Sequence, residues 1–136
     1  SSTSGLFANP GQSNYGAAKT GIATFSQIIA KELSRYNVKS NTIAPGARTR
    51  LTLATPGLED IMKPKVNAFD PWDPANISPL VAYLASTDCA FNGETFLVQG
   101  GSVTMVESWA RGAHVERDSK WTVGELADAL APHARP

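Results

Sequence analysis

The sequence of 136 residues is poor in the side chains that build disulfide frameworks and metal centres. It contains one cysteine, Cys89, and two histidines, His114 and His133. A single cysteine excludes an internal disulfide and argues against a cysteine-based zinc site. The histidines lack metal-ligand spacing, so we expect them at the surface and expect no metal site. Cys89 precedes Ala90 and Phe91 with no cation nearby, which favours a small buried residue over a reactive thiol.

The sequence also lacks an excess of charge of one sign, and it lacks long hydrophobic runs. Twelve Lys and Arg balance twelve Asp and Glu, so no long-range field draws in nucleic acid or an anionic membrane. No apolar run approaches the roughly 20 residues that span a bilayer. The chain begins Ser1-Ser2, without a Met or a charged-then-apolar leader, and we therefore expect no secretory route and a cytoplasmic location. The composition, 42% hydrophobic and 18% charged, is typical of a globular domain.

An apolar period of 3.6 residues predicts a helix over residues 14–36. The stripe that we expect to face the core is made by Ile22, Phe25, Ile29 and Leu33. Small residues at the start of this helix, Gly16 among them, allow another backbone to approach closely. Ahead of the helix, residues 1–14 are small and polar and contain Gly and Pro, so they are predicted to be a loop.

Two short β-branched and apolar runs predict buried strands over residues 38–44 and 94–98. Their order with the helices, helix–strand–helix–strand, indicates an α/β fold with parallel pairing. Right-handed crossovers would bring Pro45-Gly46 and residues 99–101, which follow the strands, to the carboxyl edge of one sheet. Ligands bind at that edge in open α/β folds.

The connection over residues 47–72 has no sustained period and contains three prolines. We predict a long excursion with one helical turn near residues 58–62, and long excursions of this kind are often functional. A second helix is expected over residues 73–85, starting at an aspartate N-cap. Pro79 either kinks this helix or delays its start to Ser78.

The last part of the sequence differs in character from the rest. Residues 104–120 mix aromatic, charged and glycine positions without a clear period. Thr122 and Glu125 have the spacing of a capping box, which predicts a short final helix over residues 123–130. We therefore expect residues 104–136 to form an extension to the α/β domain.

Tyr15 and Lys19 are the pair with the clearest chemical meaning. They are four residues apart on the first predicted helix, so their side chains emerge from one face. An ammonium beside a phenol favours the phenolate, which would make Tyr15 a general acid/base for a substrate oxygen. Ser2, at the end of a presumed strand, could hold that oxygen by a hydrogen bond. On the pair alone, an amphipathic tyrosine at a helix start and a solvated lysine are the favoured interpretation.

Several ordered segments together resemble the short-chain dehydrogenase/reductase family. They are Ser2, residues 11–19 (GQSNYGAAK), residues 41–46 (NTIAPG) and residues 93–101 (GETFLVQGG). The resemblance implies that residues 1–103 are the C-terminal half of a Rossmann-type doubly wound parallel sheet, followed by a helical C-terminal extension. It also implies that the N-terminal half of the domain lies outside these residues, so that the fragment alone would have an unpaired sheet edge and no activity.

The resemblance further implies a catalytic set of Ser2, Tyr15 and Lys19. Tyr15 and Lys19 would also contact the cofactor, NAD or NADP, with Lys19 holding the nicotinamide ribose. The turn beside the nicotinamide ring would be formed by Pro45, Gly46 and Ala47, and Thr49 would offer a hydroxyl to the carboxamide or pyrophosphate. No metal takes part in this chemistry.

More narrowly, the segments SGLF, GQSNY and PGARTRLT are similar to the dehydrogenase part of multifunctional β-oxidation enzymes and actinobacterial relatives. This implies hydride transfer to NAD from a 3-hydroxyacyl-CoA or a hydroxysteroid, in a homodimer or homotetramer. Two alternatives remain open: a 3-oxoacyl-thioester reductase that uses NADPH, and a non-catalytic nucleotide-binding protein.

Arg48 and Arg50 follow the Pro45-Gly46 turn and allow two interpretations. Their guanidinium groups could grip a CoA phosphate or a carboxylate, or they could pair with Glu59 or Asp60. The apolar residues nearby could be the wall of a substrate pocket or a packed lid; they are Leu51, Leu53, Leu58, Ile61 and Met62.

Overall fold

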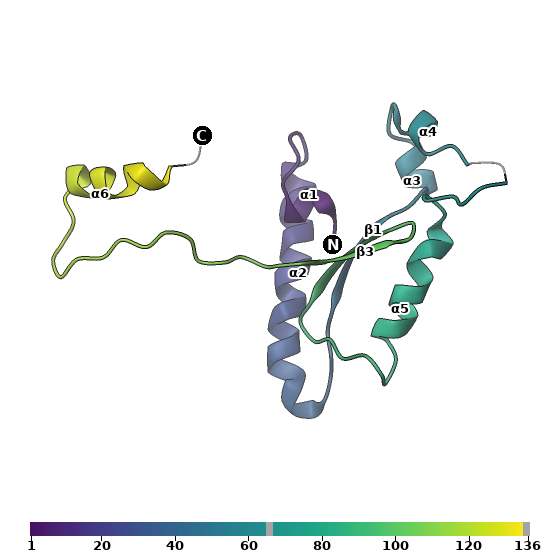
Figure 1. Ribbon diagram of the computed structural model, residues 1–136, viewed down its shortest axis with the longest axis horizontal. Helices are drawn as coiled ribbons and strands as arrows, with labels where there is room; N and C mark the ends of the chain where they lie inside the picture. The colour runs from purple at the N-terminus through teal and green to yellow at the C-terminus, as the bar shows by residue number, and fades with distance from the viewer. Residues whose placement is uncertain (65–66, 135–136) are drawn as a thin grey trace. The chain divides into compact units, whose positions relative to one another are not determined.

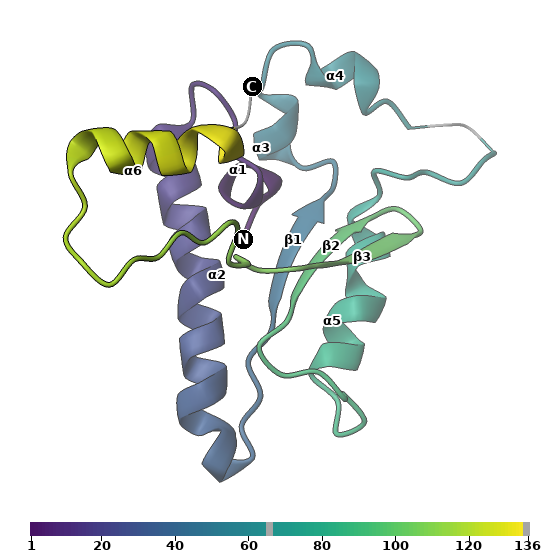
Figure 2. The ribbon, with the colours of Figure 1, turned by 60° about the vertical axis from the view of Figure 1, so that its left-hand side comes forward.

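The computed structural model describes residues 1–64 and 67–134. It divides into two compact units, Ser1–Val106 and Glu107–Pro136. In the first unit a three-stranded sheet lies between two helices, α2 and α5 (Figures 1 and 2). Within the described ranges, every helix is too short or too polar to cross a membrane.

The sheet consists of β1 (Thr42–Gly46), β2 (Thr95–Gln99) and β3 (Ser102–Val106), in that order. β1 and β2 are parallel, and the predicted α/β fold is confirmed. β3 is antiparallel to β2 and was not predicted. It forms because Gly100, at φ +55°, turns the chain straight back instead of ending the sheet.

β1 begins at Thr42, four residues later than predicted, because the backbone before it is bonded elsewhere. The Ser40 N–H donates to the Asn92 Oδ1 at 2.9 Å, and the Ser40 carbonyl accepts from the Gly93 N–H at 2.8 Å. The Asn41 side-chain Nδ2 donates to the Phe91 carbonyl at 3.0 Å. Asn41 Oδ1 also accepts from the Glu94 N–H at 3.1 Å. These bonds fasten the amino ends of the two parallel strands to each other.

Helix α2 (Ser13–Leu33) continues as a 3₁₀ turn, Ser34–Tyr36, and confirms the predicted helix over residues 14–36. Its predicted buried stripe is wrong, since Ile22 is 45% exposed and Phe25 62%. The buried face lies one residue further round the helix, at Ala23, Ser26 and Ala30. These small side chains let the helix approach the sheet closely, whereas Ile22 and Phe25 face outward. Ile29 and Leu33 of the predicted stripe are half-buried.

Residues 1–14 are not a loop throughout, because α1 (Thr3–Leu6) forms a helical turn. In the long excursion, α3 (Arg50–Leu53) was missed, whereas α4 (Leu58–Ile61) was predicted. The next segment is a 3₁₀ turn, Pro74–Ile77, followed by α5 (Ser78–Leu84). Pro79 therefore delays the helix to Ser78, one of the two expected outcomes.

The second unit contains α6 (Val123–Leu130) and a 3₁₀ turn, Ala131–His133. The capping box is present: the Glu125 N–H donates to Thr122 Oγ1 at 3.3 Å, and the Thr122 N–H donates to Glu125 Oε2 at 3.0 Å. Arg117 pairs with Glu125 at 2.6 Å and stacks over the Trp121 ring. The Thr122 hydroxyl and Arg117 hold the pKa of Glu125 below its usual value.

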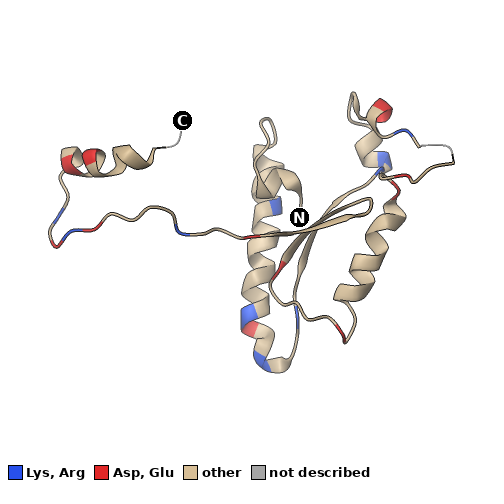
Figure 3. Cartoon of the chain, in the orientation of Figure 1, with Lys and Arg blue, Asp and Glu red and all other residues tan. Residues whose placement is uncertain are grey.

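Charged side chains are absent from the central elements of the first unit, β1 to β3 and α5, and lie on the surrounding helices and loops (Figure 3). The sheet core is accordingly uncharged: Ala44, Phe96 and Val98 are almost fully buried, together with Thr42 and Thr95. Cys89 is 1% exposed, which confirms it as a buried residue.

Candidate active site

Helix α1 lies directly against the first turns of α2, through glycines. A Cβ at Gly5 would lie 2.7 Å from Lys19 Cβ and from the Thr20 nitrogen. A Cβ at Gly16 would lie 3.2 Å from the Ser4 carbonyl oxygen. The Thr20 hydroxyl is hydrogen-bonded to the Gly5 carbonyl. The predicted close approach at the start of α2 is therefore present, and it brings the Ser1–Ser2 segment to Lys19.

Ser2 is the N-cap of α1, and its Oγ accepts a hydrogen bond from the Ser4 N–H at 3.3 Å. A hydroxyl that accepts from a backbone amide keeps its own proton for another acceptor. Next to it, the Ser1 hydroxyl donates to the Lys19 carbonyl at 2.8 Å. Ser2 is half-buried, and its position beside the Tyr15 hydroxyl stays a prediction.

Tyr15 and Lys19 lie on one face of α2, with the Lys19 Nζ 5.3 Å from the centre of the Tyr15 ring. The Tyr15 side chain is 46% exposed. Beside it is an open groove of about 460 Å³, lined by Gly11, Gln12, Ser13, Asn14 and Tyr15. A phenol and an ammonium therefore lie close together at the start of α2, and Tyr15, but not Lys19, lines the groove.

The ends of β1 and β2 form the predicted carboxyl edge. A Cβ at Gly46 would lie 3.0 Å from Gln99 Oε1, so this close approach favours glycine. A Cβ at Gly100 would lie 3.1 Å from the Pro71 backbone. The start of α2 lies at the same end of the sheet (Figures 1 and 2). Gly46 and Gln99 are register partners at this edge, as the crossover argument predicted, although Pro45 and Gly46 end β1 instead of forming a turn after it.

Ala47 and Thr49 form hydrogen bonds with Thr52 at this edge. Thr49 is the N-cap of α3: its Oγ1 accepts from the Thr52 N–H at 3.2 Å, while Thr52 Oγ1 accepts from the Thr49 N–H at 2.7 Å. The Thr52 hydroxyl also lies 3.3 Å from the Ala47 carbonyl. These contacts give Thr49 a structural role, and its role toward a cofactor stays a prediction.

Arg48 pairs with neither Glu59 nor Asp60, and that expectation is wrong. Its guanidinium contacts both carboxylate oxygens of Asp70, at 2.5 and 3.3 Å, whereas Asp60 pairs with Lys63. The hydrogen bond raises the pKa of Arg48 and lowers the pKa of Asp70. Asp70 was not predicted as the partner of Arg48, because it lies 22 residues further along the chain in a segment without a hydrophobic period.

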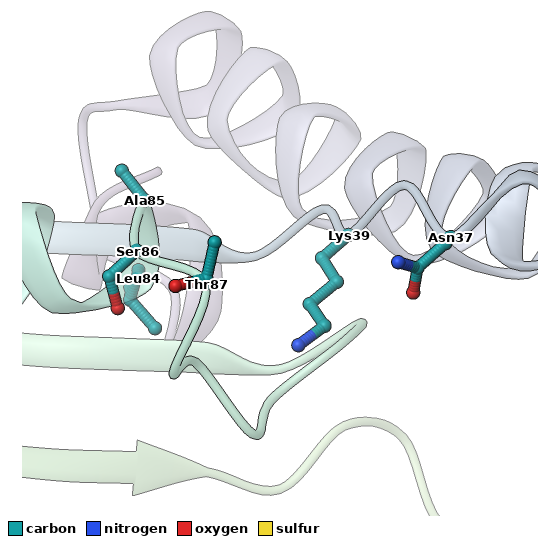
Figure 4. Close-up of a pocket in the computed structure, with 6 residues that line it drawn as sticks. All are labelled: Asn37, Lys39, Leu84, Ala85, Ser86 and Thr87. Atoms are coloured by element: carbon teal, nitrogen blue, oxygen red, sulfur yellow. The ribbon is translucent and has the colours of Figure 1, made fainter.

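A different hollow, of about 390 Å³, lies at the amino ends of the strands (Figure 4). It is lined by Asn37, Lys39, Leu84, Ala85, Ser86 and Thr87. The Lys39 amino group is engaged with the Cys89 carbonyl, and the hollow is at the opposite end of β1 from Gly46. Over residues 1–64 and 67–134, no group of His, Cys, Asp and Glu is arranged to hold a metal ion.

Comparison with known proteins gives the family. Residues 1–103 match the family model described as Enoyl-(Acyl carrier protein) reductase. A short-chain type dehydrogenase/reductase of Mycobacterium tuberculosis is 43% identical over 77% of this chain and 34% of its own length. The chain belongs to the short-chain dehydrogenase/reductase family.

Two further members of the short-chain dehydrogenase/reductase family align with nearly all of the chain. The hydroxyacyl-CoA dehydrogenase ChsB1 of M. tuberculosis is 38% identical over 96% of this chain and 41% of its own length. The crystal structure of a short chain dehydrogenase from Mycobacterium avium superposes with a TM-score of 0.79 at 37% identity, covering 100% of this chain and 43% of that one. The chain thus spans less than half the length of these family members.

Proposed function

We propose that this chain carries the catalytic residues of an NAD(P)-dependent oxidoreductase that transfers hydride between the nicotinamide and a secondary alcohol or ketone. The observation that carries the proposal is the Lys19 ammonium 5.3 Å from the Tyr15 ring, beside a groove at the carboxyl edge. The substrate would be a 3-hydroxyacyl-CoA or a hydroxysteroid. A relative named hydroxyacyl-CoA dehydrogenase, aligned over 96% of the chain, supports the first.

In this proposal Tyr15 exchanges the proton of the substrate oxygen. Oxidation of the alcohol requires a base, and the ammonium of Lys19 favours the phenolate of Tyr15 electrostatically. The Ser2 hydroxyl, whose proton is not used by its N-cap bond, donates to the same oxygen and stabilises the charge that develops there. The remaining role of the chain is to place these three groups.

The residues at the carboxyl edge fit the nicotinamide end of NAD(P). Pro45 and Gly46 are the last two residues of β1 rather than the predicted turn after it, Ala47 follows directly, and all three are uncharged. The Lys19 ammonium can donate to ribose hydroxyls. When bound, the cofactor supplies the hydride acceptor or donor. The glycine pair that follows β2, Gly100-Gly101, is a turn into β3 and not a phosphate-binding loop before a helix, so we propose that the rest of the polypeptide binds the pyrophosphate and extends the sheet beyond β1.

The test is Tyr15→Phe in the full-length polypeptide, assayed with NAD and 3-hydroxybutanoyl-CoA. Loss of a general acid/base lowers turnover by about 10²–10⁴-fold, while cofactor binding is retained. Tyr36→Phe, at a 62% exposed tyrosine, is the control and leaves turnover unchanged. Full activity of Tyr15→Phe would remove Tyr15 from the mechanism.

A second candidate is a 3-oxoacyl-thioester reductase that uses NADPH. The matched family model, described as Enoyl-(Acyl carrier protein) reductase, favours reduction of a thioester substrate. Faster oxidation of NADPH than of NADH with a 3-oxoacyl thioester would select this alternative. Cofactor binding in a titration, without turnover of either substrate, would instead indicate a non-catalytic nucleotide-binding protein.

We also propose that the full-length protein is a homodimer or homotetramer. The outward face of α2 carries exposed apolar side chains, Ile22, Phe25 and Ile28, which are costly to leave in water. Light scattering of Phe25→Glu against the wild type tests this, because a charge in an apolar interface dissociates it. Among the relatives are peroxisomal enzymes, so the expected cytoplasmic location stays a prediction.

A further inference from the structure

Helices α1 and α2 lie side by side (Figure 2) and are joined through the Thr20 side chain. The Thr20 hydroxyl, on the residue after Lys19, bonds to the Gly5 carbonyl of α1 and to the Gly16 carbonyl of α2 at 2.9 Å. The bond to Gly16 is the ordinary one between a helical threonine and the residue four positions earlier. The bond to Gly5 joins residues that are fifteen positions apart, so it fixes one helix relative to the other.

The Gly5 peptide extends this link to Ser2. Its N–H donates to the Ser2 carbonyl at 3.0 Å, and the Leu6 N–H donates to the same carbonyl at 3.1 Å. A continuous series of hydrogen bonds therefore runs from Thr20 through Gly5 to Ser2. A displacement of Gly5 away from α2 consequently displaces Ser2 as well.

Helix α1 depends on this link for its position. It has only four residues, Thr3–Leu6, and a single helical turn is not stable by itself. Gly5 and Thr20 are both half-buried, so removal of the Thr20 hydroxyl leaves a partly covered carbonyl without its partner. Such an unpaired group is costly, and a shift of α1 toward water relieves the cost. The Ser2 hydroxyl moves with that shift.

We propose that Thr20 is a positioning residue that places the Ser2 hydroxyl for its bond to the substrate oxygen, by fixing α1 to the helix that carries Tyr15 and Lys19. The proposal rests on the proposed function, because Thr20 acts through Ser2 and does not itself contact the substrate. A donor that stabilises developing charge has to be placed accurately. A displacement of about 1 Å can lower turnover by as much as about 10²-fold.

The experiment measures kcat and KM of the full-length enzyme with NAD and 3-hydroxybutanoyl-CoA, for Thr20→Val alone and in a Ser2→Ala background. Thr20→Val keeps the shape of the side chain and removes its hydroxyl. We expect kcat to fall about tenfold, with KM within about twofold of wild type, because the bond from Ser2 strengthens in the transition state. In the Ser2→Ala background the same substitution should change kcat by less than about twofold, since the group that Thr20 places is absent.

Two further variants serve as controls. Thr20→Ser keeps the hydroxyl and should retain kcat within about twofold of wild type. Thr24→Val makes the same substitution about one turn further along α2, at an exposed threonine, and should leave kcat unchanged. The affinity for NAD, measured by titration, should match the wild type in each of these variants.

An equal fall in kcat in both backgrounds, or no fall in either, would overturn the proposal. A parallel loss of NAD affinity in Thr20→Val would also overturn it, because Thr20 would then maintain the fold rather than place Ser2. If Ser2→Ala alone has the kcat of the wild type, Ser2 and Thr20 lose their assigned roles while Tyr15 keeps its own. If the wild type turns over neither this ester with NAD nor a 3-oxoacyl thioester with NADPH, the proposed function fails first, and the role of Thr20 fails with it.

Discussion

Each unit of the chain contains an arginine–carboxylate pair, and the two pairs differ in how far apart in the sequence the joined residues lie. In the first unit Arg48 and Asp70 are 22 residues apart and join the end of a strand to a distant loop. In the second unit Arg117 pairs with Glu125, within the same short stretch that forms the capping box of α6. The first unit therefore depends on contacts between remote residues, and the second on contacts between near neighbours. The candidate active site lies in the first.

The largest effect is expected where the first unit brings two backbones together. Gly5→Ala places a Cβ 2.7 Å from the Thr20 nitrogen and Lys19 Cβ, and neither backbone can yield cheaply. We expect the free energy of unfolding to fall by about 1–3 kcal/mol, measured by urea denaturation of the full-length protein. Turnover should fall as well, because the Ser2 segment moves away from Lys19.

The control for this substitution is Gly21→Ala, further along α2. A Cβ there meets no atom within 4 Å, and alanine is a better helix former than glycine by about 0.5–1 kcal/mol. Gly21→Ala should therefore stabilise the protein. If Gly5→Ala is equally stabilising, the close packing of α1 on α2 is not needed for the fold.

A smaller loss of stability, which depends on pH, is expected when the ion pair between Arg48 and Asp70 is removed. Arg48 lowers the pKa of Asp70 in the folded protein, so the pair stabilises the fold at pH values above the ordinary aspartate pKa of about 3.9. This contribution is lost as the pH falls through the lowered pKa. The Tm of Asp70→Asn should thus be below that of the wild type at neutral pH, and the two should converge in acid.

Asp60→Asn separates this effect from a general loss of negative charge. Asp60 also faces a cation, Lys63, but both side chains are exposed and such pairs contribute little. Its Tm should follow the wild type at every pH. A gap between wild type and Asp70→Asn that stays constant into acid would contradict the assigned cause.

The same contrast between remote and near contacts explains what could be predicted from the sequence. The start of α6 follows from the capping box of Thr122 and Glu125, which are three residues apart, and it could be predicted from the sequence. The partner of Arg48 was missed, because nothing near Asp70 marks it as one. The face of α2 was also misjudged: periodicity finds the apolar stripe, but the sheet accepts the small residues Ala23 and Ala30 instead.

The smallest effect is expected in the second unit, where Thr122→Ala removes the N-cap of α6. Loss of such a cap costs about 1 kcal/mol, so amide exchange within residues 123–130 should accelerate about fivefold. Thr122→Ser retains the hydroxyl and should exchange like the wild type. Exchange in β1 and β2 should not change in either variant, because α6 is stabilised by contacts within its own segment. Faster exchange in those strands would mean that the stability of α6 is coupled to the sheet, and the contrast between a remotely held unit and a locally held one would have to be abandoned.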